Sequence, residues 1–179
     1  MPIPPNQELH IFESPAAVAR AAADLLIRAA RLRITEPGAR FHVALSGGTT
    51  PRDIYERLRE SDAQDVAYLQ HTDYYWADER AVGNSHADSN VLLAKNGFLK
   101  PLGIPQERIH APDGGAPDLS EEAGLLSDLL HKQMPERFTN GAPVLDFVFL
   151  GMGTDGHTAS LFPRTEALDS LTLGYVANE

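Results

Sequence analysis

A short apolar run that ends in a glycine-rich loop, LDFVFLGMGTDGHTASLFP at Leu145–Pro163, constrains the fold of this chain more than any other stretch. The six residues before Gly151 are apolar apart from Asp146, and three glycines follow within six positions. Such a run is typical of a buried strand in a parallel sheet. Ligands of open α/β sheets bind at the carboxyl ends of the strands. We therefore expect a buried parallel strand that delivers Asp155 and His157 to the ligand-binding edge of a sheet.

Two other stretches repeat the pattern of a strand followed by a polar turn, Phe41–Pro51 and Asp73–Arg80. Strands are expected at residues 41–45, 74–77 and 108–111. Helices are expected to begin at residues that can cap a helix start, namely Ser14, Thr50, Ser89 and Asp118. The alternation of strands and helices indicates an α/β fold. A length of 179 residues without a linker or repeat suits one domain that spans residues 1–179.

Finer expectations follow from the apolar spacing. The first helix should bury the face formed by Val18, Ala22, Leu25, Leu26 and Ala29. The helix that begins at Ser89 should end at Asn96–Gly97. Beyond Pro163 the chain offers only a short helical piece and Leu173–Val176, whereas a doubly wound domain rarely ends directly after its functional loop. We therefore expect further strands and helices in the complete protein.

The bulk composition narrows the possible partners. The formal net charge of −10 argues against general nucleic-acid binding, so an anionic ligand must be held by local backbone N–H groups and a few arginines. No cysteine is present, which excludes disulfides and zinc–cysteine sites. The N-terminus lacks the features of a signal peptide, and no apolar run approaches the ~20 residues that span a bilayer. We expect a cytoplasmic protein that binds neither nucleic acid nor membranes, with a monomer favoured.

The stretch Ser46-Gly47-Gly48-Thr49-Thr50-Pro51 follows a strand and opens a helix. Glycine allows close approach of the backbone to a ligand, and the free N–H groups of a helix start favour an anion. The hydroxyls of Ser46, Thr49 and Thr50 can add donors. The lysine of a Walker loop is absent. A phosphate site and a tight turn with a helix cap explain this stretch equally well.

Two further clusters contain residues suited to catalysis. Asp78-Glu79-Arg80 ends a strand and could place a base and a cation in one cleft, although a solvated turn explains it better when taken alone. Asp155 lies two residues before His157, which can both take and give a proton near neutral pH, and a carboxylate can orient its ring. The formal G-x-G-x-x-G match beginning at Gly151 is a weak nucleotide signal.

Other chemistries find less support. A nucleophilic triad could use Ser160 or Ser46, but the chain has no G-x-S-x-G elbow. A metal site could use His86, His157 and nearby acids, but no metal-binding spacing of the HExxH type is present. The glycine-rich surroundings of His157 therefore favour a role for this histidine in proton transfer.

Taken in order, the stretches LSGGTTP, WADER with the later Asp88-Ser89-Asn90, and LGMGTDGHTASLFP resemble the signatures of the 6-phosphogluconolactonase family, which is related to glucosamine-6-phosphate deaminases. The resemblance implies a Rossmann-like three-layer sandwich with a mostly parallel sheet. It also implies hydrolysis of 6-phospho-D-glucono-1,5-lactone to 6-phospho-D-gluconate in the oxidative pentose phosphate pathway, without a metal or cofactor. The matching positions are His157, Asp155, Arg80 and Asp78 for catalysis, and Ser46, Gly47, Gly48, Thr49 and Thr50 for the phosphate.

The chain departs from the family pattern at Gly83, where proline is common, and at Arg164, where glycine is usual. Two alternatives remain. A deaminase–isomerase of the same fold is disfavoured, because that group has a tyrosine in place of Arg80 and an FNEP-like segment where this chain reads SLFP. A non-catalytic sugar-phosphate sensor is disfavoured because Asp155 and His157 are both present and no helix-turn-helix accompanies them.

Overall fold

Two buried strands form the centre of the structure. The computed structural model describes residues 7–135, 137–139, 141–171 and 174–178. Strand β1 (Phe41–Leu45) pairs in parallel with β2 (Thr72–Trp76), and every residue of both strands is buried. Strand β5 (Phe147–Val148) pairs in parallel with the other side of β1, which gives the sheet order β2-β1-β5. The expected strand at 108–111 is reduced to one parallel bridge between Ile109 and Tyr74.

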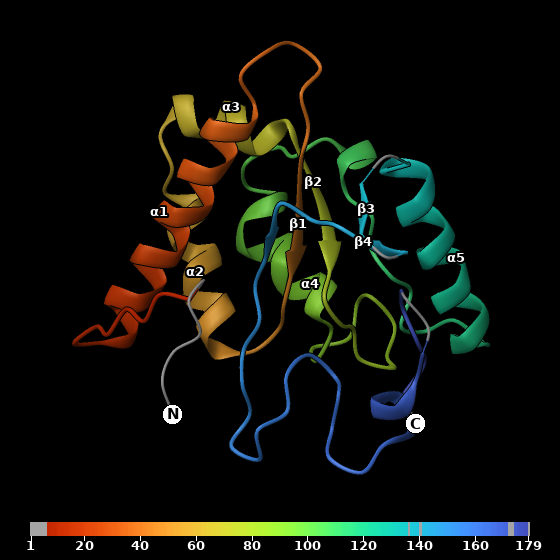
Figure 1. Ribbon diagram of the computed structural model, residues 1–179. Helices are drawn as coiled ribbons and strands as arrows, with labels where there is room; N and C mark the ends of the chain where they lie inside the picture. The colour runs from red at the N-terminus through yellow and green to blue at the C-terminus, as the bar shows by residue number, and fades with distance from the viewer. Residues whose placement is uncertain (1–6, 136, 140, 172–173, 179) are drawn as a thin grey trace.

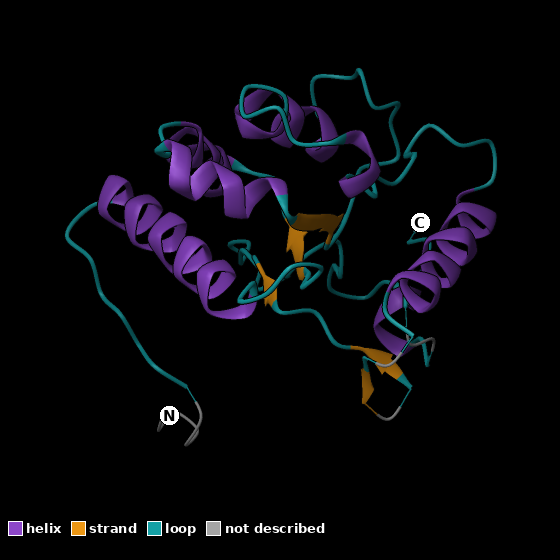
Figure 2. Ribbon diagram, turned by 90° about the horizontal axis from the view of Figure 1, so that it is seen from above, coloured by secondary structure: helices purple, strands orange, loops and turns teal. Residues whose placement is uncertain are grey.

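Helices cover both faces of this sheet, as Figure 1 and Figure 2 show. The α-helices are α1 (Pro15–Arg33), α2 (Thr49–Arg59), α3 (Ala63–Gln70), α4 (Asn90–Ala94) and α5 (Leu119–Gln133). Helix α4 continues as the π-helical turn η1 (Lys95–Leu99). Two 3₁₀ turns, η2 (Gln106–Arg108) and η3 (Glu166–Asp169), lie in the connecting segments. Helices α1 and α2 lie on one side of the sheet and α5 on the other. This arrangement confirms the predicted three-layer α/β fold with a parallel sheet.

The alternation of side chains along the strands explains the layers. Phe41, Val43 and Leu45 of β1 join the core cluster beneath α1, α2 and α4, whereas Tyr75 of β2 packs on the opposite face with Leu130 of α5. Full burial of a large apolar side chain contributes roughly 1.5–3 kcal/mol, so both faces stabilise the sheet.

The capping signals located the helix starts well. The side chain of Ser14 accepts a hydrogen bond from the N–H of Ala17, and Ser89 and Asp118 cap α4 and α5 in the same way. The prediction for Thr50 was wrong, because α2 begins at Thr49 and its N-cap is Gly48, which has no side chain to cap the helix.

The buried face of α1 differs from the predicted one. The fully buried residues are Ala19, Ala23, Leu26 and Ala30, and Leu25 is 49% exposed. Alanines occur on several sides of this helix, so the spacing of its apolar residues does not define a single buried face. The predicted end at Asn96–Gly97 was also wrong, because the helical segment continues to Leu99. Glycine is needed at position 97 inside this helical segment, because a Cβ there would lie 2.8 Å from the Cβ of Tyr55 on α2.

The organising strand is shorter and more open than predicted. Only Phe147–Val148 pairs as a strand, although the backbone N–H groups of Asp146 and Phe149 extend the pairing by donating to carbonyls of β1. Phe149 is buried, but Val148 is 42% exposed, because β5 lies at the edge of the sheet. An unpredicted antiparallel hairpin, β3 (Phe138–Thr139) with β4 (Ala142–Pro143), precedes it.

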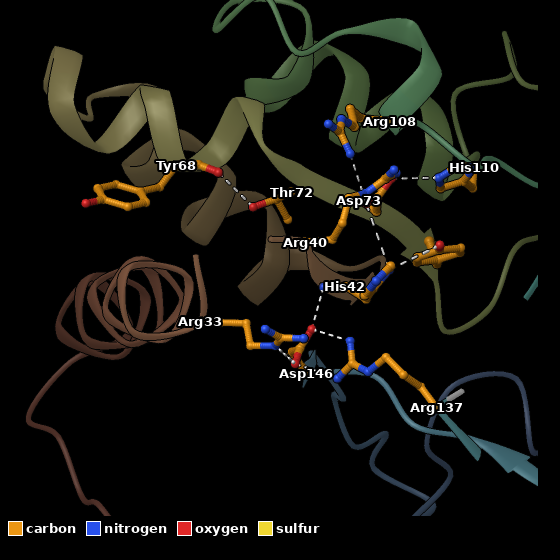
Figure 3. A network of polar contacts seen from close by, with 11 residues as sticks. Arg33, Arg40, His42, Tyr68, Thr72, Asp73, Arg108, His110, Arg137 and Asp146 are labelled. Atoms are coloured by element: carbon orange, nitrogen blue, oxygen red, sulfur yellow. Dashed lines mark hydrogen bonds and ion pairs between the residues drawn. The ribbon is translucent and has the colours of Figure 1, made fainter. Parts of the chain in front are cut away.

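The amino ends of the strands meet at what we term the amino edge, where a buried ion network joins them (Figure 3). Asp73 of β2 is fully buried and accepts hydrogen bonds from Arg40, from Arg108 at 3.3 Å and from His110 at 3.0 Å. Burial alone would raise the pKa of Asp73, but the hydrogen bonds from His110 and Arg40 outweigh it and lower this pKa to about 2.

A second carboxylate completes the amino edge. Asp146 binds both Nη atoms of Arg137 at 2.7 and 2.6 Å, lies 3.4 Å from Nε of Arg33, and accepts a hydrogen bond from the backbone N–H of His42. The His42 ring lies between the two carboxylates, 4.0 Å from Asp73. Burial lowers the pKa of His42 to about 4. This histidine is therefore neutral near pH 7.

None of the helices in the described ranges is both long enough and apolar enough to cross a membrane.

Candidate active site

The carboxyl ends of the same strands meet at the opposite edge, which we term the carboxyl edge. In Figure 1 the loops that follow β1, β2 and β5 gather below the strands. The loop after β1 turns at Gly48, whose φ of +105° favours glycine, and leads directly into α2. Because no side chain caps α2, the N–H groups of Thr49 and Thr50 remain available to an anion.

Ser46 plays a different part from the one expected for its hydroxyl. This residue is buried, and its hydroxyl donates a 2.6 Å hydrogen bond to the carbonyl of Phe149 in the neighbouring strand segment. The hydroxyl of Tyr55 on α2 donates to the carbonyl of Ser46 at 2.6 Å and accepts from its N–H at 3.1 Å. The Ser46 hydroxyl is thus engaged in joining β1 to the next strand, and it is not a free donor for an anion.

A pocket of about 240 Å³ lies at the carboxyl edge. It brings together residues from all the predicted stretches, and they are Ser46, Gly47, Gly48, Thr49, Thr50, Pro51, Asp78, Arg80, Asn90, Gly151, Met152, Gly153, His157 and Ala159. Of the predicted site residues, only Asp155 does not line it. The structure therefore places the anion loop, Asp78, Arg80 and His157 around one space.

Asp155 acts on the pocket through His157. Its Oδ1 lies 2.5 Å from Nδ1 of the His157 ring, and this hydrogen bond lowers the pKa of the Asp155 carboxyl. Phe162 covers the same ring, with centroids 4.4 Å apart. Gly153 makes room for it, because a Cβ there would lie 2.2 Å from Cε1 of His157. The imidazole is thus held by a carboxylate and an aromatic ring, next to a glycine. Among the described residues Nε2 has no hydrogen-bond partner.

The three residues of the Asp78-Glu79-Arg80 cluster have separate roles. Glu79 accepts hydrogen bonds from the N–H groups of Asn90 and Val91, both at 2.8 Å, so it holds the start of α4. Arg80 lines the pocket with His157 and is solvent-exposed. Within the described part of the chain its guanidinium has no hydrogen-bond or ion-pair partner. Asp78 accepts a 2.6 Å hydrogen bond from the hydroxyl of Ser160.

Sequence reasoning did not predict the contacts that three residues make in this site. Asn90 lines the pocket and bonds to Asp78, Ser160 joins the His157 loop to Asp78, and Phe162 covers the His157 ring. Their positions within the recognised stretches were the only signal available, because Asn90 and Ser160 bond to Asp78 of another loop and the stacking of Phe162 depends on how its own loop folds. Ala159 is also unusual, because it lines the pocket with a φ of +49°, a left-handed conformation that costs energy outside glycine.

A larger cavity of about 560 Å³ adjoins the first and shares Asp78, Arg80 and Ala159 with it. Its walls are mostly apolar and come from residues 77–81 and 112–114, from α5, and from residues 159–167 and 174–178. No group of three or more His, Asp or Glu residues capable of holding a metal ion occurs within the described residues.

The chain is similar in sequence to proteins of one family. Residues 13–178 match the family described as glucosamine-6-phosphate isomerases/6-phosphogluconolactonase. A 6-phosphogluconolactonase from Nostoc is 41% identical over 167 residues, which cover 91% of this chain and 65% of that protein. One from Chlamydia trachomatis is 38% identical over 153 residues, which cover 86% of this chain and 55% of that protein.

Solved structures give the same result. The 6-phosphogluconolactonase from Trypanosoma cruzi superposes with a TM-score of 0.76 at 27% identity, and the match covers 88% of this chain and 63% of that one. The chain thus spans between 55% and 65% of the length of the two curated relatives named above.

Proposed function

Because the chain belongs to the family of glucosamine-6-phosphate isomerases and 6-phosphogluconolactonases, we propose that it hydrolyses 6-phospho-D-glucono-1,5-lactone to 6-phospho-D-gluconate. One observation carries this proposal, namely that a single pocket joins the uncapped start of α2 to the Asp155–His157 pair. The first element suits a phosphate and the second suits proton transfer, which are the two requirements of this reaction.

The phosphate end of the substrate is bound at the start of α2. The N–H groups of Thr49 and Thr50 and the positive end of the helix dipole face an anion there, and Thr49 and Thr50 are exposed enough to add their hydroxyls. Gly47 and Gly48 keep the loop free of side chains. Binding at this point holds the lactone ring for attack, and well-oriented reactants can lower a barrier by roughly 7–11 kcal/mol.

The lactone end of the substrate is attacked by water. In this proposal Asp155 accepts a hydrogen bond from the N–H at Nδ1 of His157. Nε2 then carries the lone pair and takes a proton from the attacking water. The C1–oxygen bond of the ring then breaks, and His157 returns the proton to the departing ring oxygen. The product is the open-chain carboxylate, and one proton is released to solvent.

The negative charge of the tetrahedral intermediate requires stabilisation. Arg80 lines the pocket, and among the described residues its guanidinium has no hydrogen-bond or ion-pair partner, so it is our candidate for this role. Asp78 faces the same pocket with one carboxylate oxygen held by Ser160. We propose that Asp78 orients the sugar hydroxyls or the attacking water.

The remaining parts of the proposal come from the sequence. We propose that residues 1–179 belong to a single α/β domain that acts in the cytoplasm as a monomer. Its partner is the small sugar-phosphate lactone alone. The reaction needs no cofactor or metal.

The direct test is to mix the full-length protein with freshly prepared lactone and follow acid release, after subtraction of spontaneous hydrolysis. We expect release that is saturable, proportional to protein and insensitive to a chelator. Glucosamine 6-phosphate in a parallel assay should release no ammonia. Acid release at the spontaneous rate would refute the proposed activity, and ammonia release would assign the chain to the other branch of the family.

A further inference from the structure

Asn90 lies where the three loops of the pocket approach one another. It is the first residue of α4, is only 4% exposed, and lines the pocket. Its backbone is held in place by Glu79, because its N–H donates a 2.8 Å hydrogen bond to Oε1 of that residue. Ser89 caps the same helix start and donates its hydroxyl to Oε2 of Glu79 at 3.0 Å. The Asn90 side chain is therefore presented from a rigid position.

The amide of Asn90 holds Asp78. Its Nδ2 donates to the main-chain carbonyl of Asp78 at 3.1 Å and to the carboxylate Oδ1 at 3.3 Å. The other carboxylate oxygen, Oδ2, accepts from the hydroxyl of Ser160 at 2.6 Å. Both oxygens of Asp78 are thus bound by neutral donors from two different loops, which fixes the direction in which the carboxylate faces the pocket.

The same amide also limits which residue type fits at position 47. A Cβ added to Gly47 would lie 1.7 Å from Oδ1 of Asn90 and 2.3 Å from its Cγ. Gly48 needs to be glycine because of its φ of +105°, but Gly47 is not among the residues with positive φ. The need for glycine at position 47 therefore comes from the Asn90 side chain, which lies directly against the backbone of the anion loop.

We propose that Asn90 is a positioning residue that sets the anion loop and the Asp78 carboxylate relative to each other. This inference rests on the proposed function, because it assigns Asn90 to the same pocket. Asn90 acts through two other groups. Its Oδ1 packs against Gly47 and so limits where the backbone of the anion loop can lie, and its Nδ2 donates hydrogen bonds that orient the Asp78 carboxylate. The phosphate end and the reacting end of the substrate are thereby kept at a constant separation.

The first test is a double-mutant cycle on folding, which does not depend on any activity. Gly47→Ala should lower the melting temperature of the wild-type protein by about 4–10 °C, as expected for overpacking in a domain of this size. In an Asn90→Ala background the same change should lower it by less than half as much, because the space of the amide is vacated. Equal losses in the two backgrounds would show that Asn90 does not constrain position 47.

The second test separates positioning from folding. Asn90→Asp keeps the shape of the side chain, removes the donor to Asp78 and places a carboxylate against the anion loop. We expect kcat/KM for the lactone to fall by about 10- to 100-fold, the scale of small misplacements in a site, while the protein stays folded. Asn96→Asp is the matched control, because Asn96 lies exposed in the continuing η1 and should leave kcat/KM unchanged.

The third test measures ligand binding, which does not require the protein to hydrolyse the lactone. Calorimetric titration with 6-phospho-D-gluconate should show weaker binding to Asn90→Asp than to wild type or Asn96→Asp. If the wild type binds this ligand without hydrolysing lactone, the proposed function fails, and weaker binding to Asn90→Asp would still support the role of Asn90. If Asn90→Asp matches the wild type in both kcat/KM and affinity, the role of Asn90 is wrong and the proposed function stands.

Discussion

The two edges of the sheet differ most in how their charges are used. Four arginines, Arg33, Arg40, Arg108 and Arg137, surround two carboxylates at the amino edge, and every one of them contacts Asp73 or Asp146. Among the described residues, the carboxyl-edge pocket contains one arginine, Arg80, together with backbone N–H groups. A simple count of positive charge would place an anion at the amino edge. We place it at the carboxyl edge, because donors there are not already satisfied.

Burial separates the two edges in the same way. Asp73 is fully buried and fixed by three neighbours, so it contributes to the free energy of unfolding. The Asp155 side chain is 48% exposed and contacts a histidine on its own loop. Residues of the amino edge should therefore govern stability, and residues of the carboxyl edge should govern activity.

The largest effect is expected at His157. Replacing it with asparagine removes the proposed general acid–base group, so kcat should fall by about 10²- to 10⁴-fold. The melting temperature should not change by more than a few degrees, because the ring lies on a surface loop. His10→Asn is the matched control, since His10 is exposed near the N-terminus, and its kcat should equal that of wild type. A folded His157→Asn protein with nearly wild-type activity would contradict the proposed mechanism.

Asp73→Asn should give the opposite pattern. It removes the charge that Arg40, Arg108 and His110 contact, and breaking one side of a buried ion pair typically costs about 3–5 kcal/mol of stability. Denaturant unfolding should show this loss. At a temperature where the variant is folded, kcat should match that of wild type. A loss of kcat without a loss of stability would mean that the amino edge takes part in the chemistry.

The buried His42 makes stability depend on pH. Its pKa of about 4 lies below that of an unfolded histidine, so between pH 6.5 and pH 4 the unfolded chain binds a proton that the folded chain does not. Unfolding free energies measured from pH 7 to pH 4 should therefore fall by about 3 kcal/mol more in wild type than in His42→Asn. Parallel curves for the two proteins would show that His42 is not held neutral.

Asp73 should extend this acid sensitivity to lower pH. Its folded pKa of about 2 lies below that of an unfolded aspartate, so its stabilisation is complete above about pH 4 and is lost as the pH falls toward 2. The pH dependence of lactone hydrolysis, in contrast, should be identical in wild type and His42→Asn wherever both are folded, because His42 lies at the amino edge.

The smallest effect is expected at Arg164, which has a φ of +69° in the segment that follows the His157 loop. A non-glycine residue in this conformation is strained, so Arg164→Gly should stabilise the protein by up to about 1 kcal/mol. Arg20→Gly, in the exposed middle of α1, should destabilise it by about 1 kcal/mol. If both changes destabilise equally, the left-handed backbone at position 164 carries no strain.

Local signals in the sequence predicted much of this structure. Ser14, Ser89 and Asp118 were recognised as caps, and each accepts hydrogen bonds from the helix it begins. The strand at Phe41–Leu45 and the gathering of the anion loop with His157 were also predicted, because carboxyl ends of parallel strands share one edge. The roles assigned to these residues remain predictions.

Interactions between distant parts of the chain could not be read in the same way. The contact of Ser160 with Asp78 joins residues 82 positions apart, and nothing local in either stretch indicates it. The exposure of Leu25 and Val148 depends on how neighbouring elements pack against them, and apolar character alone suggested burial. The amino-edge network was missed for the same reason, since its arginines come from separate segments.

The most direct test of the division between the two edges is an NMR titration of the ¹⁵N-labelled protein with 6-phospho-D-gluconate. We predict that the largest amide shifts fall on Gly48, Thr49 and Thr50, with further shifts around His157, and that they saturate together. Amides near Arg33, Arg40, Arg108 and Arg137 should not move. Saturable shifts centred on those four arginines, with the start of α2 unaffected, would contradict our placement of the anion site.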